Sequence, residues 1–186
     1  MHLPRFFISA FQKNTLATVV RKAAEQGDAW AQVHLGAMYE FGNDDGVPQD
    51  DAQAAIWYRK AAEQGNINGQ WALGSLYENG HGVPLDYAEA AIWYRKAAEQ
   101  GDAGAQQSLG VLYEFGHGMP QDFAEAYFWY SLAASGFRLV NLRDEAVLCR
   151  EQRDDAALYM TPVEQARVRK RVRKWAKDHS AKPKTQ

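Results

Sequence analysis

At residues 55–65 the chain reads Ala-Ile-Trp-Tyr-Arg-Lys-Ala-Ala-Glu-Gln-Gly, and the same eleven residues return at 91–101. A looser copy follows at residues 128–136. The identical copies lie 36 residues apart, whereas the interval from Gly27 to Gly65 is 38 residues. Tandem repetition at such a period indicates a solenoid in which neighbouring units bury one another's apolar faces. We therefore expect the function to reside on a surface that several repeats build together.

Length and composition favour a single folded domain. The chain has 186 residues, 46% of them hydrophobic, which excludes a disordered class. The sole cysteine, Cys149, cannot form an internal disulfide, which suits a reducing compartment, and we expect it to be buried. The apolar cluster at residues 6–11 is shorter than a signal-peptide core, and no segment reads as transmembrane. We therefore expect a cytoplasmic protein.

Local chemistry divides each repeat into two helices. In the second repeat, Leu73, Leu76 and Tyr77 form an apolar stripe at helical spacing. Gly80 then supplies the left-handed conformation that ends a helix. The next helix begins at a capping box, an acidic residue followed three positions later by Glu or Gln. Such pairs are Asp50 with Gln53, Asp86 with Glu89, and Asp122 with Glu125. The short turns require antiparallel helix pairs.

A glycine recurs inside the first helix of each repeat, at Gly36, Gly74 and Gly110. Glycine in a helix interior costs about 1 kcal/mol relative to alanine, so a compensating contact is expected. We predict that each glycine lets a tyrosine ring of the second helix lie against its backbone. The tyrosines concerned are Tyr58, Tyr94 and Tyr130. The tryptophans that precede them, Trp57, Trp93 and Trp129, recur at one register and are expected in the core.

These residues follow the pattern Ala-x-x-x-Leu-Gly-x-x-Tyr-x-x-Gly, then Gly-Val-Pro-x-Asp, then Ala-x-x-Trp-Tyr-x-x-Ala-Ala-x-x-Gly. The pattern resembles the Sel-one-like repeat, a relative of the tetratricopeptide repeat, over about residues 13–136. The resemblance implies an all-α, right-handed αα-superhelix of antiparallel helix pairs, with the first helix of each pair lining a concave wall. It also implies a protein-binding adaptor, since members of this family are mostly adaptors and many are bacterial.

We expect one solenoid domain over residues 1–186. Its predicted parts are an N-terminal degenerate helix or cap at 1–27, three repeats at 28–65, 66–101 and 102–136, C-terminal capping helices at 137–178, and a tail at 179–186.

If the first helices line the groove, their inward positions bring aromatic side chains together on its wall. Every repeat also places a carboxylate there at the equivalent position. The predicted partner-binding residues are Trp30, Val33, Glu40, Phe41, Trp71, Ser75, Glu78, Gln107, Val111, Glu114 and Phe115. Such a surface suits a protein or peptide segment with apolar anchors and Lys or Arg nearby. Alternatively, Trp30 and Trp71 pack in the core and the glutamates are merely solvated.

The last helix is basic, whereas the rest of the chain is acidic. From Pro162 onward the charge is +7, and the remainder carries −9. Val168, Val172, Trp175 and Ala176 form the stripe that we expect to dock. The cations expected outside it include Arg167, Arg169, Lys170, Arg171, Arg173 and Lys174. A terminal cap with a polar outer surface is the favoured interpretation; contact with nucleic acid, an anionic surface or an acidic partner, or self-association, remain alternatives.

The sequence offers no catalytic constellation, metal cluster or cofactor-binding loop. His81 and His117 occupy equivalent Gly-His-Gly turns, so their recurrence follows from the repeat itself. The acidic loop at residues 43–46 lacks the flanking carboxylates of a calcium site. We therefore predict a non-enzymatic scaffold without metal or cofactor. The alternative is an immunity- or inhibitor-type protein that neutralises a basic toxin or enzyme through an acidic groove.

Overall fold

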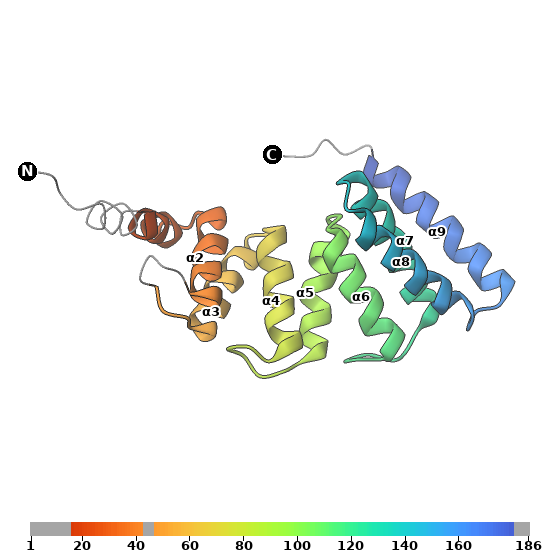
Figure 1. The fold of residues 1–186 in the computed structure, drawn as a ribbon, viewed down its shortest axis with the longest axis horizontal. Coiled ribbons are helices and arrows are strands. Elements are labelled where there is room, and N and C mark those ends of the chain that lie inside the picture. Colours follow the sequence, from red (N-terminus) through yellow and green to blue (C-terminus); the bar gives the residue numbers. More distant parts are fainter. Residues whose placement is uncertain (1–15, 43–46, 181–186) are drawn as a thin grey trace, which may run out of the picture. The chain divides into compact units, whose positions relative to one another are not determined.

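The computed structural model describes residues 16–42 and 47–180 (Figure 1). Within these ranges the secondary structure is helical, with no strand, which confirms the all-α prediction. Residues 16–25 are helical, and the following helices are α2 (Ala29–Phe41), α3 (Asp51–Glu63), α4 (Ile67–Asn79), α5 (Tyr87–Glu99), α6 (Ala103–Phe115), α7 (Phe123–Leu139), α8 (Arg143–Ala157) and α9 (Pro162–Ser180). The expectations for the cluster at 6–11, the loop at 43–46 and the end of the tail lie outside the described residues.

The chain forms two compact units, Met1–Asp86 and Tyr87–Gln186, and each is described by itself. In the first unit α3 packs against both α2 and α4. Its core joins helix 16–25 to α2 and α3 through buried Val20, Ala24, Ala31, Leu35 and Trp57. Each helix therefore buries its apolar side chains against its sequence neighbours, as expected of a repeat array.

In the second unit α7 is the central helix, because α6, α8 and α9 all pack against it. The contact between α7 and α8 includes Ala133, Ala134 and the fully buried Cys149. The predicted burial of this cysteine is thus confirmed. Burial and the nearby Glu145 carboxylate raise the pKa of Cys149 to about 11, so its thiol is protonated at neutral pH.

Side-chain caps fix the helix starts. Asp50 accepts a hydrogen bond from the Gln53 amide at 3.0 Å, and Asp122 accepts one from the Glu125 amide at 3.0 Å. Both were predicted. First helices begin in the same way, and their capping residues are Asp28, Asn66 and Asp102. Gly80 ends α4 in the left-handed conformation, with φ 68°, as predicted.

The predicted contact between glycine and tyrosine is present in both units. A Cβ added to Gly36 would lie 2.7 Å from the Tyr58 ring, and one added to Gly110 would lie 2.6 Å from the Tyr130 ring. Real side chains do not tolerate such distances, so only glycine permits this approach of the two helices. The repeated tryptophans Trp57, Trp93 and Trp129 are also buried, as predicted.

A buried glutamine, which the sequence pattern did not single out, joins each first helix to the helix before it. Gln32, Gln70 and Gln106 are at most 4% exposed. Their Nε2 atoms donate to the carbonyl oxygens of Ala24, Ala62 and Ala98, at 3.1, 3.2 and 3.0 Å. The same contact recurs between Gln165 of α9 and the Ala157 carbonyl at the end of α8, at 3.0 Å. Each of these carbonyls also accepts a backbone N–H from three residues further on, so the glutamine is its second donor and ties the end of one helix to the next.

Gly110→Ala is expected to lower the free energy of unfolding by about 1–3 kcal/mol, because the new methyl overlaps the Tyr130 ring. In a Tyr130→Ala background the same change should be neutral, or stabilising by up to about 1 kcal/mol, since alanine is the better helix former. A double-mutant cycle measured by urea unfolding gives the coupling. The cycle of Gly36 with Tyr58 is the parallel case in the first unit. Purely additive effects would contradict the close contact.

Gln106→Leu is expected to destabilise the second unit by about 0.5–1.5 kcal/mol, because a buried hydrogen bond to the Ala98 carbonyl is lost and the Gly101 amide is then its remaining donor. Gln165→Leu removes the equivalent bond, and with it the bond from Arg169, at a half-exposed position, where water can replace the lost partners. Its cost in urea unfolding should therefore be clearly smaller. Equal costs for the two variants would show that burial does not set the strength of this contact.

Candidate functional site

In the first unit, the first helices leave large aromatic side chains at the surface. Trp30 and Phe41 of α2 are 62% and 76% exposed, and Trp71 of α4 is 43% exposed. Trp30 stacks on His34 of the next turn, with ring centroids 3.6 Å apart. Val33, three residues after Trp30, and Ser75, four residues after Trp71, are half-buried. The indole rings of Trp30 and Trp71 are therefore open to solvent, unlike those of the repeated tryptophans.

In the second unit, the corresponding helix is α6. Phe115 is 61% exposed at its end, and Gln107 and Val111 are half-buried. Gln107 donates a hydrogen bond from Nε2 to Oε1 of Gln152 at 3.1 Å, which links α6 to α8. The predicted residues of α6 thus lie next to α8, which was expected only as a part of the C-terminal cap.

The predicted carboxylates Glu40 and Glu114 each bind a tyrosine inside the protein. Glu40 Oε2 accepts a hydrogen bond from the Tyr58 hydroxyl, and Glu114 Oε2 accepts one from the Tyr130 hydroxyl, both at 2.6 Å. Each glutamate follows its repeat glycine by one helical turn, so the tyrosine that lies on the glycine places its hydroxyl at the carboxylate. Burial, and then the adjacent carboxylate, raise the pKa of both tyrosines. Glu78 of α4 is half-buried.

A different set of tyrosines, those of the first helices, makes a recurrent contact with arginine that sequence reasoning missed. Arg21 donates to the Tyr39 hydroxyl at 3.2 Å. Arg59 and Arg95 donate to the hydroxyls of Tyr77 and Tyr113 in the same way. The constant spacing of 18 residues between arginine and tyrosine was a signal that could have revealed these pairs.

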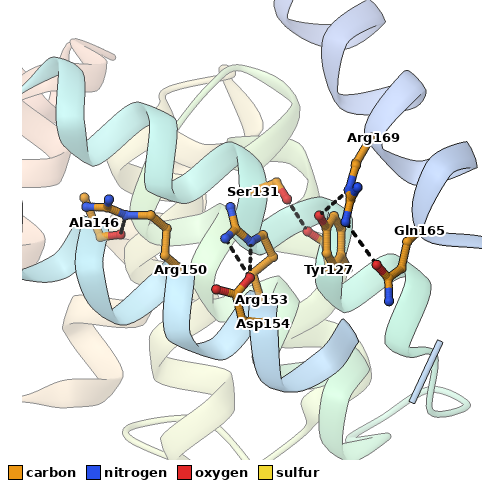
Figure 2. A network of polar contacts seen from close by, with 8 residues as sticks. All are labelled: Tyr127, Ser131, Ala146, Arg150, Arg153, Asp154, Gln165 and Arg169. Carbon is orange, nitrogen blue, oxygen red and sulfur yellow. Dashed lines mark hydrogen bonds and ion pairs between the residues drawn. The ribbon is translucent and has the colours of Figure 1, made fainter. Parts of the chain in front are cut away.

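The basic helix α9 packs on α7, and two of its cations, Arg169 and Arg171, also contact that helix. Figure 2 shows the contacts of Arg169. Val168 is 3% exposed, and Val172 and Trp175 are half-buried. Arg169 Nε donates to the Tyr127 hydroxyl at 3.2 Å and Arg169 Nη2 donates to Gln165 at 3.0 Å. Tyr127 also lies beneath the guanidinium of Arg153, 5.9 Å from the ring centroid.

Three residues of the basic helix, Ala176, Arg169 and Arg171, differ from the prediction. Ala176, expected in the docked stripe, is exposed. Arg171, expected outside the contact, donates from Nη1 to Glu125 Oε1 at 2.6 Å and lies over the Phe128 ring at 4.4 Å. Arg169 and Arg171 sit at the edges of the docked face, where a long side chain reaches back to α7. They are thus engaged in docking, while Arg167, Lys170, Arg173 and Lys174 are exposed on the helix.

The recurrent histidine turns have a structural explanation. A Cβ added to Gly82 would lie 2.2 Å from the Asp51 carbonyl, and one added to Gly118 would lie 2.4 Å from the Ala88 amide. Both glycines also have positive φ, 67° and 71°, so the turns need glycine and carry the histidine between them. Residues 16–42 and 47–180 contain no group of three or more His, Cys, Asp or Glu placed to hold a metal ion. In the same ranges no helix combines the length and hydropathy of a membrane span.

The raised pKa of the two tyrosines predicts a specific alkaline behaviour. A tyrosine in the unfolded chain ionises near pH 10. The pKa of each tyrosine is higher in the folded state. Each therefore contributes fully to the free energy of unfolding below about pH 10, and this contribution is lost as the pH rises above about 10. The free energy of unfolding of Tyr58→Phe/Tyr130→Phe should therefore fall less steeply than that of the wild type above pH 10, by up to about 1.4 kcal/mol per pH unit for each site. Urea unfolding between pH 8 and 11 measures this, and parallel curves would contradict it.

Comparison with known proteins identifies the repeat. The Sel1 repeat model matches residues 31–66, 67–102 and 103–136. A protective antigen of uropathogenic Escherichia coli with an SLR fold aligns over 91% of this chain with 30% identity and a TM-score of 0.74. This chain spans only 36% of that antigen.

A second solved structure, a Sel1 repeat protein from Oxalobacter formigenes, has 41% identity and a TM-score of 0.60, and the alignment covers 63% of this chain and 88% of that protein. A search of curated proteins gives no match. The SLR-fold neighbours confirm the expected fold class. With matched repeats over more than half of its length, the chain belongs to the Sel1 repeat family.

Proposed function

We propose that this protein is a non-enzymatic scaffold that binds a protein or peptide partner on the exposed faces of its first helices. These faces comprise the predicted residues of α2 and α4 in the first unit and of α6 in the second. Membership of the Sel1 repeat family supports a partner of this class. The assignment to particular residues rests on the side chains themselves.

One observation carries the proposal: within the repeats, the two tryptophans that do not recur are exposed, whereas the three that recur are buried. Trp30 and Trp71 are 62% and 43% exposed, while Trp57, Trp93 and Trp129 are at most 9% exposed. The fold does not require an exposed tryptophan, and aromatic side chains dominate the energy of binding interfaces. The exposed rings are therefore the expected anchors for a partner.

The charge of the chain favours a basic partner segment. Outside the last helix and tail the sequence carries −9, which would steer Lys and Arg toward it. Glu40 and Glu114 each retain one carboxylate oxygen besides the one that accepts from tyrosine. Since the hydroxyl of a buried tyrosine donates to the other oxygen, these carboxylates suit binding and orienting a partner's cation rather than proton transfer. The single buried cysteine suits a reducing compartment, and we propose the bacterial cytoplasm as the place of action.

The test uses a phage-displayed random peptide library selected on the immobilised full chain. We expect the selected peptides to combine aromatic or aliphatic residues with Lys or Arg. Failure to enrich any sequence, or enrichment of acidic peptides, would contradict the proposal. If a natural partner captured through such a motif loses an enzymatic activity on binding, the inhibitor alternative is favoured over the scaffold.

Trp71→Ala is expected to weaken binding of the selected peptide about 10- to 100-fold, as loss of an aromatic anchor does. Its effect on the free energy of unfolding should stay below about 1 kcal/mol, because surface substitutions usually cost little. Ile56→Ala is the matched control: Ile56 is 46% exposed in the same unit, but on a second helix, α3. Isothermal titration calorimetry measures both. Equal losses of affinity in the two variants, or binding retained in Trp71→Ala, would remove Trp71 from the site.

A further inference from the structure

The outward face of α9 is a stripe of cations that the proposed partner site does not use. Val163, Arg167, Lys170 and Lys174 recur at intervals of three or four residues, so they share one face of the helix. All four side chains are exposed. We call this set the outer stripe. Val168 and Val172 lie on the opposite face, toward α7. In the described part of the chain no ion pair involves the three cations of the outer stripe.

Contacts on the other side of α9 hold the outer stripe in place. Arg169 binds the Tyr127 hydroxyl, and Arg171 binds Glu125 and lies over Phe128, as Figure 2 shows for Arg169. Thr161 and Glu164 form a capping box at the start of the helix, with the Thr161 amide donating to Glu164 at 2.7 Å. The cations of the outer stripe are thus displayed by a docked and capped helix.

Apolar side chains are exposed at the amino-terminal end of the outer stripe. Leu158 and Tyr159, in the turn before α9, are 79% and 71% exposed, and Val163 is 69% exposed. Tyr159 is held by stacking on Phe123, with centroids 4.4 Å apart. A terminal cap needs a polar outer surface, so exposed aliphatic and aromatic groups beside a row of cations are unexpected for a cap alone.

We propose that the outer stripe docks this protein on the surface of a lipid bilayer that contains anionic phospholipids. Arg167, Lys170 and Lys174 contact the headgroups, and Leu158 and Val163 enter the boundary between headgroups and acyl chains. Three cations near an anionic surface raise the affinity by about two orders of magnitude. Nucleic acid would satisfy the cations but leave the apolar tip without a partner, which is why the bilayer is favoured.

The first experiment is flotation of the full chain with vesicles of phosphatidylcholine alone and with 30 mol% phosphatidylserine. We expect binding only to the anionic vesicles, and we expect it to be lost in 0.5 M NaCl because salt screens exposed charges. Equal binding to both vesicles, or no binding to either at low salt, would overturn the proposal. Preferential binding to a DNA or RNA duplex with no vesicle binding would overturn it in favour of nucleic acid.

Matched variants locate the contact. Arg167→Gln/Lys170→Gln/Lys174→Gln should weaken vesicle binding about 100-fold, from the loss of three cations. The control is Lys22→Gln/Arg138→Gln/Arg143→Gln, which changes the net charge equally at three other exposed cations. Leu158→Ser/Val163→Ser should weaken binding while leaving its salt dependence. Circular dichroism establishes that each variant folds. Equal loss in the stripe and control variants would show a general charge effect and overturn the proposal.

Binding of the library peptide at Trp71 should be unchanged in the outer-stripe variant. The two proposals therefore fail separately: loss of vesicle binding leaves the partner site intact, and loss of peptide binding in Trp71→Ala leaves vesicle binding intact.

Discussion

The structure depends on the contact between a tyrosine ring and the backbone of a glycine inside the neighbouring helix. The contact leaves no room for a side chain at the glycine. This contact sets how closely Gly36 and Gly110 approach Tyr58 and Tyr130. Once the ring is in place, its hydroxyl meets the glutamate one turn beyond the glycine, so a polar group at the edge of the core is satisfied without water. The rotations of α2 and α6 are thereby fixed. This constraint decides which residues of these helices are exposed.

Much of the fold could be predicted from the sequence, because the repeat period, helix caps and glycine positions are local signals. The Asp50 and Asp122 caps and the burial of Trp57 follow directly from spacing. The buried glutamines and the bonds of Glu40 and Glu114 could not be predicted in this way. They depend on where a side chain of one helix ends relative to another, a distance that spacing along the chain does not contain. The same limit explains why Arg169 and Arg171 were expected outside the α9 contact.

The repeat also separates structural from functional residues. Positions occupied by the same residue in every copy largely serve packing, whereas Trp30 and Trp71 stand at positions that differ in every copy and are exposed. Variation within an otherwise regular array is thus the best signal in this chain for a binding surface. The outer stripe of α9 is a second surface of different chemistry. A scaffold with one face for a partner and another for an anionic bilayer would hold that partner at the membrane surface.

Fluorine NMR of the chain labelled with 5-fluorotryptophan tests the central claim most directly, since its six tryptophans report on core, first-helix face and α9 separately. Resonances are assigned by single Trp→Phe variants and followed as a selected peptide is added. The account predicts that Trp30 and Trp71 shift, while Trp57, Trp93 and Trp129 stay unchanged. Shifts confined to the repeated tryptophans, with Trp30 and Trp71 unaffected, would contradict it.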